Sequence, residues 1–358
     1  MRIGEGTTIL ITGGAGFIGS NLASRLLERG CRVRILDSLV RPGVERNLEW
    51  LSQAHGDRVE PVIADLRESG VFARAVQGID AAYHFAAQVA VTTSLADPRA
   101  DFDINLAGTF GLLEAMRRDR PGVPMVFAST NKVYGDLSDV GVQPGAGGYI
   151  PANAQLAQYG VPESRPLDFH TPYGCSKGAA DQYVLDYARS YSLPAAVFRM
   201  SCIYGERQMG TEDQGWVAHF LIRALAGEPI TLYGDGEQVR DICDVADTCD
   251  AYIAALQNIG KISGRALNWG GGPENAVSLL TLIDQIGVMT GRMPRIEFAD
   301  WRAGDQRWFV ADTRAADREL GLRRRKPWRE GLRDLVAWLS ESRGLPLNPE
   351  ARSTVQVS

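Results

Sequence analysis

The segment TTILITGGAGFIGS, residues 7–20, joins a short apolar run to a glycine-rich turn and the start of a helical pattern. Residues 7–12 are apolar and β-branched, which predicts a buried strand. After the glycines, Ile18, Leu22, Leu26 and Leu27 recur at helical spacing, and Gly30 ends the pattern. The stretch therefore predicts a strand, a tight turn and an amphipathic helix, in that order.

The same alternation of short apolar runs and helical patterns continues to about residue 205, and we expect strands at 7–12, 31–37, 58–65, 79–87, 123–130 and 194–201. Strands that alternate with helices predict an α/β fold with a doubly wound parallel sheet covered on both faces. Beyond residue 205 the elements become shorter, although DICDVADTCDAYIAALQNIG still resembles a strand end followed by a helix. We therefore expect a Rossmann domain interleaved with a smaller α/β lobe and followed by a loose tail, divided as 1–190 plus about 235–262, about 191–234 plus 263–345, and 346–358.

The glycines in the first turn have the spacing of a dinucleotide-binding loop. Gly14, Gly16 and Gly19 fit G-x-G-x-x-G, a pattern that allows a tight turn and a close approach of the backbone to a pyrophosphate. The expected second strand ends in Asp37, whose carboxylate can accept hydrogen bonds from ribose hydroxyls and would repel a 2′-phosphate. The pattern predicts NAD as the cofactor, while Arg41 nearby leaves NADP open.

Several residues at the expected carboxyl edge of the sheet carry candidate chemistry. Ser129 and Thr130 end the fifth strand, and Tyr173 and Lys177 in YGCSK are four apart, which places both on one face of a helix. A phenol with a pKa of about 10 is a poor base, but an adjacent ammonium and a positive nicotinamide ring would favour its phenolate. We expect Tyr173 to take a proton from a substrate hydroxyl that Thr130 also binds.

These motifs together resemble the extended short-chain dehydrogenase/reductase family, through TGGAGFIG, Asp37, HFAAQ at 84–88, Asn105 in NLAGT, STNKVYG at 129–135 and YGCSK at 173–177. The resemblance implies catalysis by Thr130, Tyr173 and Lys177 in an enzyme that holds NAD. It also implies a homodimer or homotetramer formed by the helices near 99–118 and after Tyr173. The expected cofactor-binding residues are Gly13, Gly16, Phe17, Ile18, Gly19, Asp37, Asp65, Leu66, Ala86, Ala87, Gln88, Asn105, Ser129, Tyr173 and Lys177.

Within that family, the segments STNKVYGD, DQGW, EQVRD and GDQRWFVAD are similar to epimerases that invert C2 of CDP-linked 6-deoxyhexoses. This likeness implies a nucleotide-diphosphate sugar as the substrate, with a CDP-6-deoxyhexose favoured. FRMSCIYGERQ departs from the pattern at Met200 and Cys202, so the nucleotide and the sugar stay open. The expected substrate-binding residues are Thr130, Asn131, Met200, Ser201, Gln214, Trp216, Arg240, Arg302 and Asp305.

Four other functions compete with this hypothesis. A hexose 4-epimerase would use the same residues, and a 4,6-dehydratase would need an acid and a base, for which related dehydratases place an Asp-Glu pair after the catalytic threonine. This chain has Asn131 and Lys132 there, which disfavours elimination. A non-catalytic NAD-binding scaffold would not need the intact Thr130, Tyr173 and Lys177, and a hydrolase would need a nucleophile-elbow sequence around Ser129.

The composition of the chain limits the kinds of partner that the protein is expected to bind. The 358 residues carry 38 basic and 43 acidic side chains, for a net charge of −5 and a pI of about 5.5, which offers no footprint for nucleic acid. No long apolar run predicts a membrane span, the five cysteines include no C-x-x-C pair and the four histidines show no metal-ligand spacing, with His84 expected to be packed in a strand. We expect a cytoplasmic protein without a metal.

Overall fold

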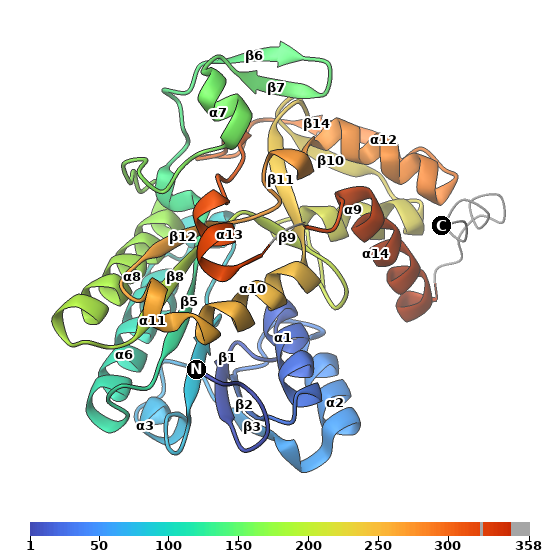
Figure 1. The fold of residues 1–358 in the computed structure, drawn as a ribbon. Helices are drawn as coiled ribbons and strands as arrows, with labels where there is room; N and C mark the ends of the chain where they lie inside the picture. The colour runs from blue at the N-terminus through green and yellow to red at the C-terminus, as the bar shows by residue number, and fades with distance from the viewer. Residues whose placement is uncertain (323–324, 345–358) are drawn as a thin grey trace.

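A seven-stranded, fully parallel sheet forms the centre of the computed structural model, which describes residues 1–322 and 325–344 (Figure 1). The six strands expected from the sequence are all present, so the predicted doubly wound α/β fold is confirmed. A seventh strand, β12, pairs with β8 at one edge and was not predicted. In spatial order the strands are β12 (Ala266–Trp269), β8 (Ala195–Met200), β5 (Met125–Thr130), β4 (Ala81–His84), β1 (Thr8–Thr12), β2 (Arg32–Asp37) and β3 (Val59–Ile63).

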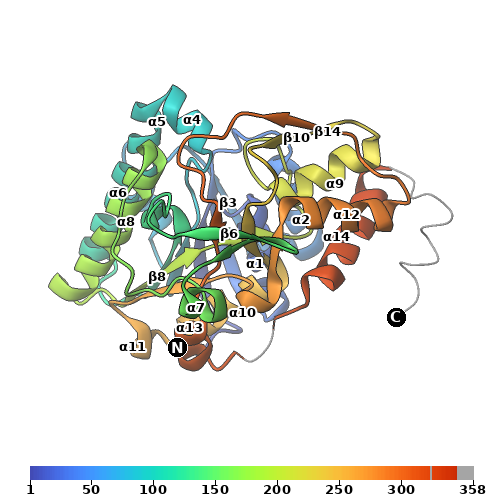
Figure 2. The same cartoon turned by 90° about the horizontal axis from the view of Figure 1, so that it is seen from above.

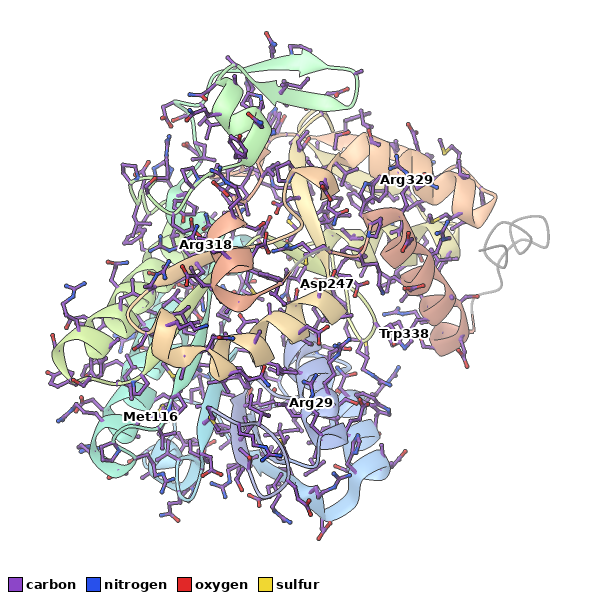
Figure 3. All side chains as sticks on the ribbon, in the orientation of Figure 1. Arg29, Met116, Asp247, Arg318, Arg329 and Trp338 are labelled. Carbon is purple, nitrogen blue, oxygen red and sulfur yellow. The ribbon has the colours of Figure 1, made fainter. Side chains whose placement is uncertain are left out.

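Helices cover both faces of this sheet, because its strands send alternate side chains to opposite sides. On β1, Ile9 and Ile11 pack in one hydrophobic core with α1 (Phe17–Glu28), α2 (Val44–His55) and α10 (Val245–Gln257). Leu10 points to the other core, under α3 (Val71–Ala75), α6 (Gly108–Asp119) and α8 (Thr171–Ser190). Figure 2 shows α6 and α8 together on one side and α1 and α2 on the other. Met116 of α6, labelled in Figure 3, is fully buried in the second core.

A smaller sheet lies above the carboxyl ends of the large one. Its strand β11 (Val239–Asp244) pairs with β13 (Ala276–Ser278), β15 (Trp308–Phe309) and β9 (Cys202–Tyr204). A separate pair joins β10 (Ile230–Tyr233) to β14 (Ile296–Ala299). A third hydrophobic core contains residues of β10 and β11 with α9 (Trp216–Ala226), α12 (Leu279–Thr290) and α14 (Trp328–Arg343).

The chain passes between the two sheets more than once. Only Ser201 separates β8 from β9, and α10 follows β11 directly at Val245. Strands β8 and β12 belong to the large sheet, although the predicted division gave 191–234 and 263–345 to the smaller lobe. The division into two lobes stays a prediction, but β8 and β12 have to be assigned to the larger lobe. The predicted tail, 346–358, lies outside the described residues.

Over the described ranges, no helix is both long and apolar enough to span a membrane.

Shorter elements connect the sheets and cover their edges. A single π-helical turn, η2 (Asp103–Ala107), lies between α5 (Pro98–Phe102) and α6. The remaining elements are η1 (Gly56–Arg58), α4 (Val91–Ala96), η3 (Asn131–Tyr134), β6 (Val142–Gly145), β7 (Gly148–Pro151), α7 (Ala154–Tyr159), α11 (Ile259–Ile262), η4 (Pro273–Asn275) and α13 (Arg314–Leu320).

Candidate active site

An open cleft of about 1780 Å³ runs along the carboxyl ends of the large sheet and under the smaller one. Open α/β folds bind their ligands at this edge. Every cofactor- and substrate-binding residue expected from the sequence lines the cleft, except Asn105. A second hollow of about 460 Å³, on the outer face of α1, contains none of them.

The glycine loop leaves room for a ligand at the amino end of α1. Gly13 has a φ of +69°, and a Cβ on it would lie 2.7 Å from the backbone nitrogen of Ala86, so a side chain fits neither the conformation nor the space. Helix α1 begins at Phe17, and its N-cap, Gly16, offers no side-chain cap. The first N–H groups of the helix are therefore available to an anion, as a dinucleotide pyrophosphate requires. These residues fit NAD.

Asp37 lies at the end of β2, beside the glycine loop. Its carboxylate accepts hydrogen bonds from the backbone N–H groups of Ala15 (3.1 Å) and Leu39 (2.9 Å). Burial raises the pKa of Asp37, although these N–H groups oppose the shift. Arg41 lines the same end of the cleft, where burial lowers its pKa and the charge of Asp37 partly restores it. The carboxylate is thus held by backbone groups, not by the arginine.

The residues after β3 and β4 complete this wall. The carboxylate of Asp65 is bound by its neighbour Arg67 at 2.7 Å, and this hydrogen bond lowers the pKa of Asp65. Leu66 lies under Gly108, where a Cβ on the glycine would come within 3.2 Å of its side chain. Ala86 and Ala87 follow β4 and line the cleft with small side chains.

Asn105 supports the cleft from behind and is not among the residues that line it, and its contact with the cofactor stays a prediction. Its amide oxygen accepts from the N–H of Gln88 (2.8 Å), and its amide nitrogen donates to the Gln88 carbonyl (3.0 Å). The same nitrogen lies 3.0 Å from Asp101 and 3.1 Å from Ser176. The π-helical turn projects Asn105 inward, so that it fixes the loop after β4. Such turns are frequent at functional sites.

His84 is buried and neutral, as its place in an apolar strand predicted. Its two ring nitrogens contact the hydroxyls of Thr12 (2.5 Å) and Thr109 (3.0 Å), and burial lowers its pKa to about 3. Thr109 donates its own proton to the Asn105 carbonyl at 2.6 Å, so it must accept from the histidine N–H. The histidine therefore ties β1 and β4 to the start of α6. The part of the chain that the structure describes contains no group of side chains able to hold a metal ion.

Thr130, Tyr173 and Lys177 come together at the end of β5. The Tyr173 phenol is hydrogen-bonded to Thr130, but burial raises its pKa to about 12. The Lys177 ammonium donates to the Ala128 carbonyl at 2.6 Å and lies 4.2 Å from the centre of the Phe127 ring, and burial lowers its pKa to about 7. The ammonium that was expected to act on the phenol thus binds a backbone carbonyl in the chain alone. Protein groups by themselves keep Tyr173 protonated.

Ser129 lines the cleft, but its hydroxyl is bound to a group of the protein. Its hydroxyl donates to Asp181 at 2.8 Å, and Asp181 forms a fully buried ion pair with Arg199 at 2.9 Å. A buried, well-bonded pair of this kind costs several kcal/mol to break on one side only. The serine therefore joins β5 to α8 and β8, and Asp181 also adds negative charge close to Lys177.

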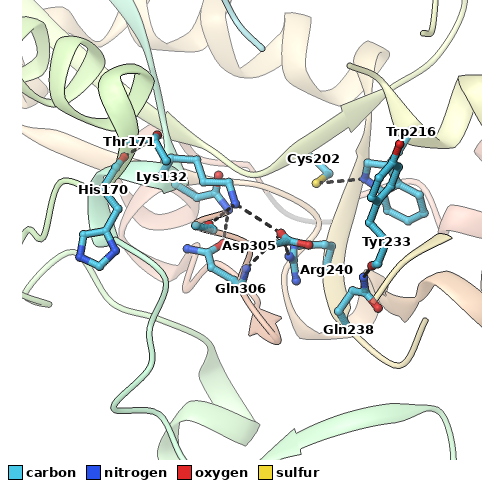
Figure 4. A network of polar contacts seen from close by, with 12 residues as sticks. Lys132, His170, Thr171, Cys202, Trp216, Tyr233, Gln238, Arg240, Asp305 and Gln306 are labelled. Atoms are coloured by element: carbon cyan, nitrogen blue, oxygen red, sulfur yellow. Dashed lines mark hydrogen bonds and ion pairs between the residues drawn. The ribbon is translucent and has the colours of Figure 1, made fainter. Parts of the chain in front are cut away.

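Lys132, Asp305 and Arg240 form a second charged group in the cleft (Figure 4). Asp305 lies 2.6 Å from the Arg240 guanidinium and 3.5 Å from the Lys132 ammonium, which also donates to the Gly304 carbonyl at 3.2 Å. Burial alone would raise the pKa of Asp305, but the two cations reverse the shift and lower it. Burial lowers the pKa of Lys132, and Asp305 opposes this change. Asp305 is the counter-ion of two cations.

The other expected substrate-binding residues on the floor of the cleft have protein partners. The Asn131 amide donates to Gln306 at 3.1 Å, and the Met200 sulfur accepts from the Tyr252 hydroxyl at 3.2 Å. Ser201 donates to the carbonyl and the carboxylate of Asp241. These contacts fix the floor of the cleft. Because the hydrogen-bond donors of Asn131 and Ser201 are used within the protein, the side chains present their surfaces, not these donors, to the cleft.

The upper wall carries Trp216, Gln214 and Arg302. The Trp216 indole donates to Cys202 at 3.4 Å, and the guanidinium of Arg302 stacks 3.9 Å from the centre of the Tyr233 ring. Gln214 pairs through its backbone with Thr211. Flat aromatic and guanidinium surfaces are suited to a nucleobase.

Sequence reasoning missed some residues that shape the site. Lys132 was noticed only because it is not a carboxylate, and Gln306, which binds both Asn131 and the Gly135 carbonyl at 2.6 Å, carried no local signal. Asp181 could have been found, because it lies one helical turn beyond Lys177 on the same face of α8.

Comparison with known proteins agrees with this geometry. Residues 9–270 match the model of the NAD dependent epimerase/dehydratase family. The chain is 41% identical over 339 residues to the CDP-paratose 2-epimerase of Salmonella typhi, covering 93% of this chain and 99% of that protein. Among solved structures it resembles a dTDP-glucose 4,6-dehydratase from Streptomyces venezuelae with NAD bound (TM-score 0.80, 30% identity, 94% and 98% covered). It also resembles the UDP-glucuronic acid 4-epimerase from Bacillus cereus in complex with UDP-glucuronic acid and NAD (TM-score 0.80, 26% identity, 94% and 100% covered).

Proposed function

Since the chain belongs to the NAD dependent epimerase/dehydratase family, we propose that it is an epimerase that inverts C2 of a CDP-linked 6-deoxyhexose, with CDP-paratose as substrate. The observation that carries the choice of substrate is the 41% identity to a CDP-paratose 2-epimerase over nearly the full length of both chains. The protein is an NAD-dependent enzyme of nucleotide-sugar chemistry, and the solved relatives hold NAD.

The charges beside the catalytic threonine support epimerisation over elimination of water. Elimination needs an acid and a base next to the sugar, and Asn131 and Lys132 offer neither a free carboxylic acid nor a carboxylate there. Asp305, the carboxylate that Lys132 contacts, is bound by Arg240 and has a lowered pKa. It is therefore a poor proton carrier.

In the proposed reaction the chain moves one proton, and the oxidised sugar must turn its other face toward the cofactor before the hydride returns, because a sugar held still would only be restored to substrate. Thr130 and Tyr173 bind the reacting hydroxyl, and the phenolate of Tyr173 takes its proton and later returns it. Bound NAD⁺ supplies a hydride acceptor and a positive charge beside the phenol. Lys177 adds a second positive charge on the same helix face, which lowers the free energy of the phenolate.

The cofactor is assigned to the glycine side of the cleft. Gly13, Gly16 and the first turn of α1 bind the pyrophosphate, and Asp37 accepts from the adenosine ribose. The substrate occupies the opposite side, where Arg240 and Arg302 bind the diphosphate and Trp216 contacts the base. Asn105 supports the loop that carries Gln88, and the other cofactor- and substrate-binding residues expected from the sequence keep their expected roles.

The test of this function is the fate of the C2 hydrogen. We incubate the enzyme with CDP-paratose deuterated at C2 and follow the product by NMR. Deuterium retained at C2 of an inverted sugar supports internal hydride transfer, and loss of deuterium to solvent refutes it. Inversion of another nucleotide sugar, or dehydration, with CDP-paratose left untouched would reject the substrate and favour a 4-epimerase or a 4,6-dehydratase. NAD binding without change in any sugar would favour a scaffold.

We also propose that two copies of the chain pair through α6 and α8. Phe110, Tyr183 and Tyr191 expose 43%, 44% and 53% of their surface there, and Phe110 packs edge-on against Tyr183. A contiguous apolar patch on two neighbouring helices fits a self-complementary interface. Tyr183→Glu should convert the dimer to a monomer in sedimentation experiments, and a wild-type protein that is already monomeric would contradict the pairing.

We place the enzyme in the cytoplasm, in a reducing environment. All five cysteines are free, and Cys31, Cys243 and Cys249 are buried. Fusion to a periplasmic leader, followed by mass spectrometry of disulfide-linked peptides, would test whether oxidation impairs folding.

A further inference from the structure

Lys132 is a cation inside the cleft for which the sequence suggested no role. Its side chain is 21% exposed and lines the cavity, and its ammonium contacts Gly304 and Asp305 across the cleft. Two contacts leave one of its three N–H donors without a protein partner among those described. A lysine is expensive to hold in such a position, because burial disfavours its charge.

The position of Lys132 relative to the reacting groups is fixed by its backbone. The backbone N–H of Lys132 donates to the Thr130 hydroxyl at 3.2 Å, and this hydroxyl is hydrogen-bonded to Tyr173. The Lys132 side chain ends at Asp305, which is bound by Arg240 (Figure 4). Lys132 thus contacts the threonine of the catalytic pair through its backbone and, through its ammonium, the counter-ion of the arginine proposed to bind the diphosphate.

The chemistry of the proposed reaction requires an anion near that point. In a nucleotide sugar the diphosphate is attached to C1, which is bonded directly to C2. An enzyme that reacts at C4 holds the diphosphate across the ring from its catalytic tyrosine. An enzyme that reacts at C2 must hold it next to the tyrosine and therefore needs a cation close to the catalytic threonine.

We infer that Lys132 binds the phosphate attached to the sugar and thereby presents C2, not C4, to the reacting groups. This inference rests on the proposed function. Asp305 keeps the ammonium extended into the cleft, and because it is shared with Arg240, the three groups carry one net positive charge before substrate arrives. A preorganised positive site of this kind favours a diphosphate without prior rearrangement.

Ligands that differ by one phosphate isolate this contact. We measure the binding of CMP, CDP and CDP-paratose to the NAD-loaded protein by titration calorimetry, for wild type, Lys132→Met and Lys132→Arg. The matched control is Lys261→Met, which changes an exposed lysine outside the cleft. We expect Lys132→Met to weaken the binding of CDP and of CDP-paratose by about 10-fold or more and to leave the binding of CMP unchanged, because only CDP and CDP-paratose carry the second phosphate. Lys132→Arg should recover part of the loss.

Other patterns overturn the inference. Weaker binding of CDP-paratose with unchanged binding of CDP would mean that Lys132 contacts the sugar alone. An equal loss of affinity for CMP and CDP would mean that its role is purely structural. If Lys132→Met does not fold, as judged by its NAD content, Lys132→Gln is measured in the same way. Failure of the proposed function has a different signature: wild-type protein would then leave C2 of CDP-paratose uninverted in the NMR experiment, and the comparison of CMP with CDP would still report on the contact of Lys132 with the second phosphate.

Discussion

Lys177 should destabilise the protein when NAD is absent. The lysine is 3% exposed, and burial lowers its pKa from 10.5 to about 7. Each tenfold change in acidity corresponds to about 1.4 kcal/mol, so at pH 7 the fold disfavours this side chain by roughly 4–5 kcal/mol relative to the unfolded chain. Replacement by methionine removes this cost but also leaves the Ala128 carbonyl without its donor, which costs about 1–3 kcal/mol. We therefore expect Lys177→Met to raise the free energy of unfolding at pH 7 by about 2 kcal/mol.

The sign of the pH dependence follows from proton counts. Between pH 7 and 10.5 the unfolded chain binds a proton at Lys177 that the folded chain has largely released, so the free energy of unfolding should rise with pH. Below pH 7 both states are protonated and this contribution is constant.

Urea unfolding of NAD-stripped protein at pH 6, 7, 8 and 9 measures the effect as the difference between wild type and Lys177→Met. The difference should be largest at pH 6 and 7 and should shrink toward pH 9, whereas Lys261→Met should follow wild type throughout. With NAD restored the order should reverse, because the variant loses a proposed anchor of the cofactor. A Lys177→Met protein that is less stable than wild type at pH 7 without NAD, with no change of the difference across the pH range, would refute the reasoning.

Three other variants test the site and its support. Tyr173→Phe should lower turnover about 100-fold or more while the NAD content, read from the denatured protein, stays normal; near-normal turnover would exclude the phenol as the base. Gly13→Ala should lose bound NAD and lower the melting temperature, because the new Cβ would lie 2.7 Å from the Ala86 nitrogen, and a fully NAD-loaded variant would contradict this. Asp181→Ala should destabilise the fold by about 3–5 kcal/mol in urea unfolding, since it leaves the buried guanidinium of Arg199 unpaired; a loss under 1 kcal/mol would show that the pair is not buried in solution.

Local patterns were sufficient for six of the seven strands of the large sheet and for the residues at its edge. Gly13, Asp37 and Tyr173 each follow or begin an element whose periodicity is clear, so parallel topology alone brings them to one cleft. Strand β12 was missed because ALNW is too short and too mixed in polarity to stand out from a loop.

Contacts between distant segments could not be predicted from spacing. The pairing of Lys132 with Asp305 depends on how the loop before β15 crosses the cleft, and the support of Gln88 by Asn105 depends on a π-helical turn that has no sequence signature. The pKa values of Tyr173 and Lys177 depend on burial, which the i, i+4 spacing does not reveal. Residue types at motif positions identified the chemistry, and tertiary packing determined the state of each group.

The passage of β8 into β9 with only Ser201 between them has a consequence for protein engineering. Because the chain also crosses between the sheets where β11 meets α10 and between β12 and β13, the substrate side of the cleft is not one continuous segment. A chimera that exchanges this side with a relative needs a junction at each crossing, and the Ser201 junction carries a hydroxyl bonded to Asp241. New substrate preferences should therefore be sought by replacing individual side chains on the cleft walls, not by transplanting a block.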